Sequence, residues 1–418
     1  MIKNNILLLI KFGLLFMAFF PLLPNKIKGL PLIVLLLIAI FYFIQEKKRT
    51  FNWKLFLINA SVYIVYIVTL LYTDNISYAI KKLETASALL LYPLIFNLLW
   101  SSRKKINRKM LMHDFVKLLF WTIFIYTSIV FAFLINTGMF KYFNDPNFFR
   151  HFTEFIPLIG QHSIYSSTFL GLGLLSSIFL FNYNSKIINK ILVLIGAIAM
   201  IILLFLLSSK GVLISIFISI SIYLILSIKK SFLYITALFF LFLASTVYSP
   251  SLSNRVDLFI ENYSYTNSIT FEEKLSSTQI RIEIYKCSVN LLNDNWIIGY
   301  GLGDINDTLM ECYKSTNTSL IEGHYNAHSQ YFSIFLGSGI VGFILFLIFL
   351  IFNYKSAFKN KNYFYFSALI LYSIIMLVEN VLERQSGVIM FAFLVNFLYY
   401  ITYQELNNSN QTSEIELL

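Results

Sequence analysis

Charge is scarce in this sequence of 418 residues. Asp, Glu, Lys and Arg together make up 13% of it, whereas hydrophobic residues make up 58% and aromatic residues 18%. A soluble domain carries about twice that share of charged residues, so the composition excludes an ordinary soluble protein. The sequence therefore predicts an all-α integral membrane protein.

Long apolar runs take the place of the missing charge. A membrane-spanning helix needs about 20 mostly apolar residues, and runs of this length predict about twelve spans. The predicted spans lie at about 6–23, 29–44, 55–72, 84–100, 116–136, 161–182, 188–207, 211–228, 231–249, 328–353, 363–380 and 386–404. They divide the chain into helices 1–9 (1–249), one large loop (250–327), helices 10–12 (328–404) and a polar tail (405–418).

Lys and Arg are unevenly distributed over the short connections. With a cytoplasmic N-terminus, the inner connections carry 16 basic residues and the outer ones 8. The positive-inside rule then predicts that both termini are cytoplasmic and that the 250–327 loop lies outside the cytoplasmic membrane. The net charge of +11 is assigned to cytoplasmic loops lying against anionic membrane lipids, so no nucleic-acid partner is expected.

The large loop contains one segment with helical spacing. Ile280, Ile284, Cys287 and Leu291 repeat at intervals of three or four residues, which predicts an amphipathic helix lying at the membrane surface. The glycine-rich GYGLGD at 299–304 is not a dinucleotide-binding GxGxxG, so we interpret it as a turn. Gly337, Gly339 and Gly342, further along, are expected to let helix backbones approach closely.

Ionisable side chains gather on the predicted outer side. Groups of this kind are expensive to bury near a bilayer, so they mark a site or line a wet cavity, although any one of them could simply lie at headgroup level. The residues concerned are His162, Lys210, Arg281, His324, His328, Glu379, Glu383 and Arg384.

One segment among these resembles a known family. HSQYFSIFLGSGIVG places His328, Ser329, Gly339 and Gly342 at a spacing that resembles the histidine-and-glycine motif of the O-antigen ligase and polymerase superfamily. Phe343 stands where a polar residue is often found in that motif.

Three further segments extend the resemblance over about 160–404. LLSSKGVLISIFI carries Lys210 where the family more usually has Arg, and RIEIY through GYGLGD resembles the family's loop arginine, here Arg281, followed by a Gly-x-Gly turn. ENVLERQSGVIMF resembles the glutamate-bearing segment between the last two helices.

The resemblance implies a metal-independent membrane glycosyltransferase without a cofactor. Such enzymes move a glycan from an undecaprenyl-diphosphate carrier to a sugar hydroxyl, on lipid A-core or on another glycan, outside the bacterial inner membrane. His328 is then the general base, and Arg281 and Lys210 bind the leaving diphosphate. His324, His162, Glu379, Glu383 and Arg384 are expected to bind the acceptor or to support the site.

Two metal sites compete with this interpretation. His324 and His328 are four residues apart, the spacing of two zinc ligands on one helical face, but no downstream ligand is visible. Asp304 and Asp307 flank the glycine-rich turn without a third placed ligand. We expect neither to bind metal.

The only two cysteines, Cys287 and Cys312, both lie in the large loop. A disulfide persists in an oxidising compartment, and this one would connect the Arg281 helix to the segment that leads to His328. Cys287 would equally serve as a small apolar residue on the helix. The sequence leaves both alternatives open, because pairing requires a distance that no sequence supplies.

Three functions remain to be separated. A ligase and a polymerase of this superfamily need the same base and the same cations, and the histidine motif and the segment between the last helices look closer to the ligases. A polytopic transporter or flippase would also want many helices. Transporters are often built from repeats with broken helices, and the sequence shows neither, so this is the weakest alternative.

Overall fold

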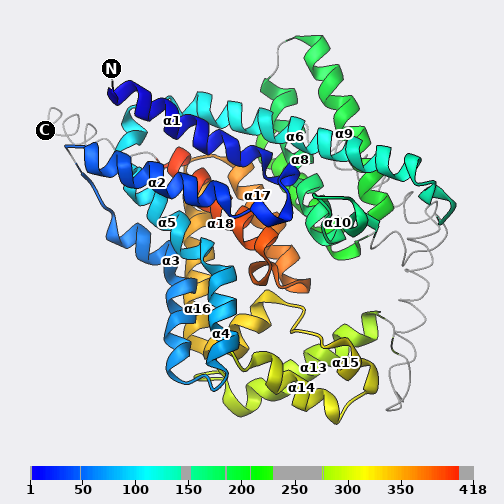
Figure 1. The fold of residues 1–418 in the computed structure, drawn as a ribbon. Helices are drawn as coiled ribbons and strands as arrows, with labels where there is room; N and C mark the ends of the chain where they lie inside the picture. The colour runs from blue at the N-terminus through cyan, green and yellow to red at the C-terminus, as the bar shows by residue number, and fades with distance from the viewer. Residues whose placement is uncertain are drawn as a thin grey trace, which may run out of the picture.

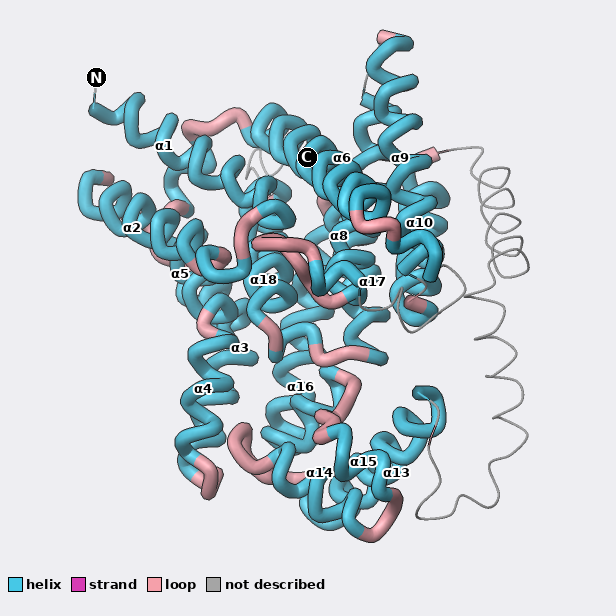
Figure 2. The backbone as a smooth tube through the Cα atoms, turned by 45° about the vertical axis from the view of Figure 1, so that its right-hand side comes forward, coloured by secondary structure: helices cyan, strands magenta, loops and turns pink. Residues whose placement is uncertain are grey.

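The computed structural model describes residues 2–47, 49–142, 152–183, 186–207, 209–228, 275 and 277–403, and all structural statements concern these residues. Within them every regular element is a helix (Figures 1 and 2). The α-helices are α1 (Ile2–Phe16), α2 (Leu30–Gln45), α3 (Trp53–Val68), α4 (Ile76–Ala86), α5 (Ala88–Leu98), α6 (Arg108–Asn136), α8 (Ser163–Tyr183), α9 (Ile187–Leu207), α10 (Lys210–Ser227), α13 (Ser277–Asn295), α14 (Ile305–Lys314), α15 (Thr318–Gly323), α16 (Gln330–Lys359), α17 (Tyr363–Val378) and α18 (Gln385–Thr402). Short 3-10 helices lie at Met17–Leu22, Asn25–Ile27, Thr69–Leu71, Trp100–Lys104, Met139–Tyr142, Phe152–Phe155 and Val381–Glu383.

Nine helical stretches in the described part are long and apolar enough to cross a membrane, which fits an integral membrane protein. They correspond to predicted spans 1–3, 5–8, 10 and 12. Predicted span 363–380 is the shorter α17, and predicted span 231–249 lies outside the described residues. The total of twelve therefore stays a prediction.

The predicted span at 84–100 differs from the structure. The chain there forms α4 and α5, which meet at Ser87, and α5 is only 11 residues long. Residues 73–83, which the sequence suggested were a short outer connection, largely form α4. This polar helix brings Lys82 toward the centre of the molecule.

The connections between the spans fall into two groups, one at each end of the helical body, and contacts within each group show which connections belong together. At one end Lys105 forms an ion pair with Glu46, and Asn362 Nδ2 donates to Thr402 Oγ1 at 2.6 Å. At the other end Lys82 forms an ion pair with Glu383, and the peptide N–H of Asn25 donates to the Leu158 carbonyl at 3.2 Å. We call the second the His328 end. Which end faces the cytoplasm rests on the basic-residue bias alone, so the orientation stays a prediction.

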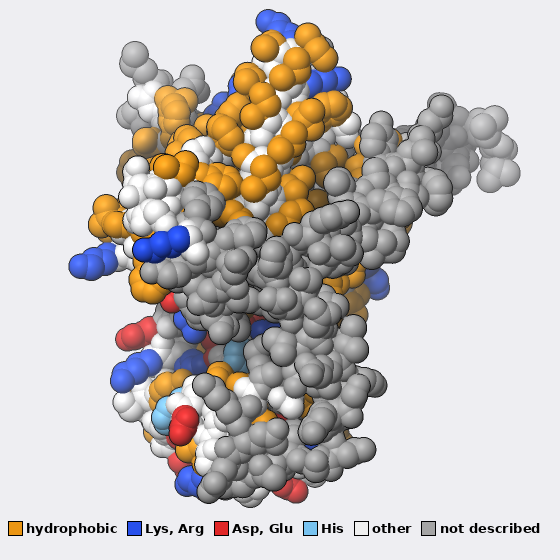
Figure 3. Space-filling view, turned by 90° about the vertical axis from the view of Figure 1, so that its right-hand side faces the viewer, with side chains coloured by type: hydrophobic (Ala, Val, Ile, Leu, Met, Phe, Trp, Pro, Cys, Tyr) orange, Lys and Arg blue, Asp and Glu red, His pale blue; other side chains and the backbone are white. Residues whose placement is uncertain are grey.

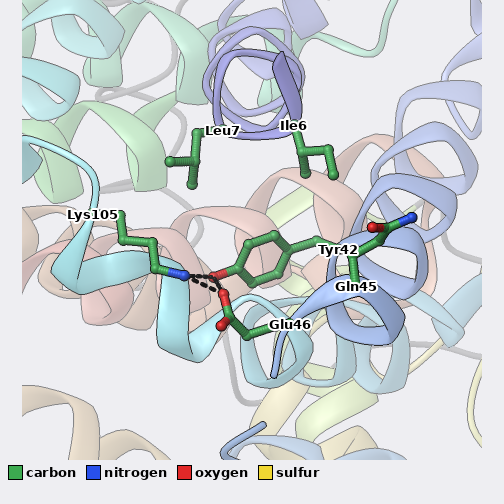
Figure 4. Close-up of a pocket in the computed structure, with 6 residues that line it drawn as sticks. All are labelled: Ile6, Leu7, Tyr42, Gln45, Glu46 and Lys105. Carbon is green, nitrogen blue, oxygen red and sulfur yellow. Dashed lines mark hydrogen bonds and ion pairs between the residues drawn. The ribbon is translucent and has the colours of Figure 1, made fainter. Parts of the chain in front are cut away.

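A small pocket lies at the end opposite His328 (Figure 4). Its polar floor is the Glu46 carboxylate, which accepts from Tyr42 Oη at 3.0 Å and pairs with Lys105. The lining residues are Ile6, Leu7, Tyr42, Gln45, Glu46 and Lys105. Tyr42, Glu46 and Lys105 thus bind one another. These contacts attach α2 to the connection before α6, and Ile6 and Leu7 of α1 line the other side of the pocket.

α16 is a hairpin and not the continuous span predicted at 328–353. Gly339 has φ 61° and ψ −165°, which reverses the chain between the helical segments 330–338 and 340–359. The rings of Phe335 and Phe343 stack at 5.0 Å, and those of Tyr331 and Phe346 lie 5.5 Å apart. In a straight helix the latter pair would be separated by about 22 Å. The first segment therefore folds back against the second, which keeps about 20 residues to cross the bilayer.

The layer α13–α15 lies across one end of the helical body (Figure 1) and is attached through the glycine-rich turn. Gly299 and Gly301 have φ 77° and 88°, a backbone conformation that favours glycine. It lets the N–H groups of Tyr300 and Gly301 donate to the carbonyls of Leu336 and Gly337 at 2.7 and 3.0 Å, just before the hairpin reverses. The turn interpretation of GYGLGD is thus confirmed, and the turn joins the layer to α16.

The amphipathic helix predicted in the loop is α13, but its apolar face is covered by protein. Ile284 and Cys287 are fully buried, and α13 packs on α14 and α16. Cys287 and Cys312 form a disulfide with Cα atoms 5.9 Å apart, which joins α13 to α14. The side of α13 that was expected to lie on the bilayer therefore forms the core of the layer.

Candidate functional site

His328 lies in the short connection between α15 and the first segment of α16. Its φ is 44°, a left-handed conformation that is uncommon for a residue with a side chain. Two hydrogen bonds hold its backbone: its N–H donates to Asn326 Oδ1 at 3.1 Å, and its carbonyl accepts from Tyr285 Oη at 3.2 Å. The imidazole is therefore placed by contacts from both the connection and α13.

Glu379 faces the imidazole. It follows the last residue of α17, is buried, and places Oε2 3.7 Å from His328 Nδ1. Nδ1 is itself buried and has no hydrogen-bond partner among the described residues, while 21% of the His328 side chain stays exposed. One nitrogen of the ring is thus directed at a carboxylate, and part of the side chain remains open to a ligand.

The electrostatics of Glu379 show which other groups lie close to it. Burial alone would raise the pKa of its carboxyl, but His328, followed by His162 and Arg281, lowers that pKa below its usual 4.5. Glu379 is therefore ionised at neutral pH. Three of the residues selected from the sequence act on this one carboxylate.

Arg281 reaches the site from α13. It is half-buried, precedes Tyr285 by one helical turn, and makes no hydrogen bond or ion pair to another described residue. Tyr285 Oη also donates to the Leu377 carbonyl at 3.2 Å, so this face of α13 is held against the end of α17. The guanidinium is thus placed near Glu379 with its donors available.

Lys210 and His162 approach from the ends of two other helices. Lys210 begins α10, and its neighbour Gly211 lies so close to Val378 that an added Cβ would be 2.7 Å from Val378 Cγ2. His162 precedes α8, with Nε2 3.9 Å from Glu154 Oε1. The starts of α10 and α8, which are far apart in the sequence, therefore both lie near the end of α17.

Glu383 belongs to a second polar group. It pairs with Lys82 and accepts a hydrogen bond from Asn380 Nδ2 at 2.6 Å. Burial alone would lower the pKa of the Lys82 ammonium, but Glu383 raises it above its usual 10.5. Arg384 is exposed and lies at the start of α18. Sequence reasoning missed Lys82, because nothing in its local sequence marks a partner 301 residues away.

The structure shows where the residues of the two metal-ligand patterns lie. His324 ends α15 with φ 45° and is exposed, so His324 and His328 share no helical face. Asp304 accepts from the N–H groups of Asp74 and Asn75 at 2.7 and 2.8 Å, which attaches the glycine-rich turn to the start of α4. Among the described residues no group of three His, Cys, Asp or Glu could hold a metal ion.

The site opens to the surface. Figure 3 shows a hollow between the apolar helical body and the α13–α15 layer, where basic, acidic and histidine side chains gather. In the same view, apolar side chains cover much of the helical body. A ligand with a charged head and a lipid tail would match that combination of surfaces.

Comparison with known families agrees with the chemistry of this hollow. The family model described as O-antigen ligase matches residues 195–347. The match covers 153 of the 418 residues, so less than half of the chain is similar to this family. None of the curated proteins matches the chain.

The segment that matches the O-antigen ligase model contains much of the site. It runs from within α9 to the second segment of α16 and includes Lys210, Arg281, His324 and His328. The match supports the superfamily that the sequence motifs suggested. His162, Glu379, Glu383 and Arg384 lie outside the matched segment, so their part in the site is an inference from geometry.

Proposed function

We propose that this protein is an O-antigen ligase-like glycosyltransferase. It moves a glycan from an undecaprenyl-diphosphate carrier to a sugar hydroxyl of lipid A-core, outside the bacterial inner membrane. The observation that carries the proposal is the partly exposed His328 facing the buried carboxylate of Glu379, with Arg281 close enough to lower the pKa of that carboxyl. A base and a cation in one open hollow are what transfer from a diphosphate requires.

His328 is the general base in this proposal. The acceptor hydroxyl attacks the anomeric carbon of the donor sugar, its proton passes to the imidazole, and the bond from that carbon to the diphosphate oxygen breaks. Glu379, ionised and facing Nδ1, orients the ring and stabilises the imidazolium. The distance of 3.7 Å is long for a hydrogen bond, and catalytic contacts often shorten when substrate binds.

The leaving group is a lipid-linked diphosphate whose negative charge must be stabilised. Arg281 presents a planar fork of donors that matches two phosphate oxygens, and Lys210 adds a point charge from the start of α10. Both cations come from the segment that matches the O-antigen ligase model. We propose that transfer needs no metal ion. Transfer that persists in a chelator supports this, and loss that a divalent ion restores contradicts it.

A polymerase of the same superfamily is the alternative. It would use the same base and the same cations and would differ in its acceptor, a second carrier-linked glycan. Lipopolysaccharide from a strain that lacks the protein separates the two functions. Loss of all attached long chains indicates a ligase, whereas core carrying a single repeat unit indicates a polymerase.

The reaction class is tested with purified protein in lipid vesicles. The vesicles receive an undecaprenyl-diphosphate glycan and a lipid A-core or glycan acceptor, and both transferred and translocated glycan are measured. Formation of the new glycosidic bond supports the proposal. Translocation of the donor without transfer would contradict it and would favour a flippase.

A further inference from the structure

Three adjacent apolar side chains stand out on the surface of the α13–α15 layer. Trp296, Ile297 and Ile298 follow α13 directly and are exposed by 50, 55 and 55%. The residues just before them, Asn293 and Asp294, are polar and exposed. The chain thus changes from a polar to an apolar surface within a few residues. We call residues 296–298 the Trp296 edge.

On one side the Trp296 edge adjoins the membrane-facing surface of α16. The N–H of Ile340 donates to the Trp296 carbonyl at 2.9 Å, immediately after the hairpin reverses at Gly339. The next residue, Val341, is 61% exposed and begins a stripe of exposed apolar residues on the second segment of α16. The stripe continues through Ile344, Ile348 and Ile351. These residues lie on a helical stretch that is long and apolar enough to cross a membrane, and their exposure suits contact with lipid.

On the other side the edge adjoins α3. Tyr72 Oη donates to the Ile298 carbonyl at 2.9 Å, and Leu71, beside it, is 86% exposed. Leu71 ends the membrane span formed by α3 and the following 3-10 turn. The Trp296 edge is therefore bounded by the ends of two lipid-facing spans and continues their apolar surface.

We propose that the Trp296 edge inserts into the bilayer leaflet at the His328 end. Its occupant is the headgroup and acyl-chain boundary of ordinary membrane lipid, where a tryptophan ring with one polar N–H is most stable. The inserted edge fixes the depth of α13, and with it the depth of Arg281 relative to the lipid. This inference does not depend on the proposed transfer reaction, because it rests only on exposure and on the neighbouring spans.

Fluorescence of Trp296 tests the insertion. The other three tryptophans are replaced by phenylalanine (Trp53→Phe, Trp100→Phe and Trp121→Phe), and the protein is reconstituted in phospholipid vesicles with bromine on the acyl chains. We expect strong quenching by bromine placed just below the headgroups and little quenching by aqueous acrylamide. The matched control carries Trp296→Phe and Glu311→Trp. Its tryptophan lies on exposed α14, so acrylamide should quench it and brominated lipid should not.

A second measurement needs only one substitution. Ile297→Cys and Glu311→Cys are compared in vesicles for their reaction with a charged maleimide, and we expect Ile297→Cys to react far more slowly. Equal reactivity, or equal acrylamide quenching of Trp296 and of the control, would overturn the proposal. So would protection of the edge only after polyprenyl phosphate is added, or only at protein concentrations at which two copies associate.

Discussion

His328 occupies a strained backbone conformation at the centre of the site. A residue with a Cβ is disfavoured at φ 44°, and the surrounding structure has to hold it there. Asn326 and Tyr285 supply the two hydrogen bonds that do so. Because the conformation directs Nδ1 toward Glu379, the strain serves the placement of the ring.

Variants of Arg281 distinguish the effect of its positive charge from the effect of its planar guanidinium shape. We expect Arg281→Ala to weaken donor binding and to slow transfer, and Arg281→Lys to recover only part, because an ammonium cannot make the paired contact to two phosphate oxygens. Lys286→Ala is the matched control: this lysine lies on the same helix, is exposed, and pairs with Glu283 at 2.7 Å. Steady-state transfer rates at several donor concentrations check the expectation. Equal losses in Arg281→Ala and Lys286→Ala would show that Arg281 contributes only general charge.

Glu379 makes a prediction about pH. Its pKa in the folded protein lies below the usual 4.5, so its ionised form adds stability that is fully present above pH 4.5 and is lost as pH falls through the lowered value. The stability difference between wild type and Glu379→Gln should therefore persist from about pH 7 to about pH 5 and shrink only in more acid solution. Thermal unfolding in lipid over this range measures it. A difference that disappears between about pH 7 and pH 5 would mean that Glu379 is not the group responsible.

At the scale of elements, the α16 hairpin gives the site its depth. Tyr331 lies beside Phe346, well along the membrane-crossing segment, so the chain that carries His328 folds back into the molecule and does not continue outward. Backbone that breaks a helix at membrane depth is tolerated where protein or water surrounds it. Gln330 and Ser333 on the first segment are buried in protein, as this requires.

Gly339→Ala tests the hairpin. A Cβ at Gly339 would lie 2.1 Å from the Ile297 carbonyl oxygen, and the combination of φ 61° with ψ −165°, which residues other than glycine rarely adopt, adds a cost of about 1–3 kcal/mol. Gly138→Ala is the control, because Gly138 has a similar φ of 62° with no atom within 4 Å of an added Cβ. We expect Gly339→Ala to lower the melting temperature far more than Gly138→Ala. Similar losses in the two variants would argue against the tight turn at Gly339.

The disulfide between α13 and α14 makes a separate prediction. The two cysteines are 25 residues apart in the sequence. Closing a loop of that length reduces the entropy of the unfolded chain, which stabilises the folded protein by about 3 kcal/mol. Thiol labelling of denatured, unreduced protein should find no reactive thiol until a reductant is added, and reduction should lower the melting temperature. Two reactive thiols before reduction would exclude the bridge.

At the scale of the whole molecule, the pattern of apolar residues predicted the arrangement of the chain better than the positions of single polar residues did. Apolar runs located nine of the predicted spans on long apolar helices of the described part, because burial in lipid demands such runs over a fixed length, whereas the run at 84–100 forms parts of two shorter helices. The reversal at Gly339 was missed, since the apolar run continues through it and only backbone geometry reveals the turn. The apolar face of α13 was recognised from its spacing, but the spacing could not say whether lipid or protein covers it.

The site was predicted as a set of residues and not as an arrangement. Arg281, His328 and Glu379 were each selected from the sequence, and their convergence depends on packing between α13, α16 and α17. Lys82 was missed because its partner Glu383 is distant in the sequence. The four-residue spacing of His324 and His328 lies in a connection and not on a helix, which the sequence alone could not show.

The most direct test of the account is the rate of glycan transfer by His328→Ala in reconstituted vesicles. The protein should insert and fold as wild type does, and its transfer rate should fall by about 10² or more, the usual scale for loss of a general base. His324→Ala, four residues earlier and exposed, is the control and should retain most of the activity. A His328→Ala protein that transfers glycan near the wild-type rate would contradict the assignment of His328 as the base and, with it, the proposed mechanism.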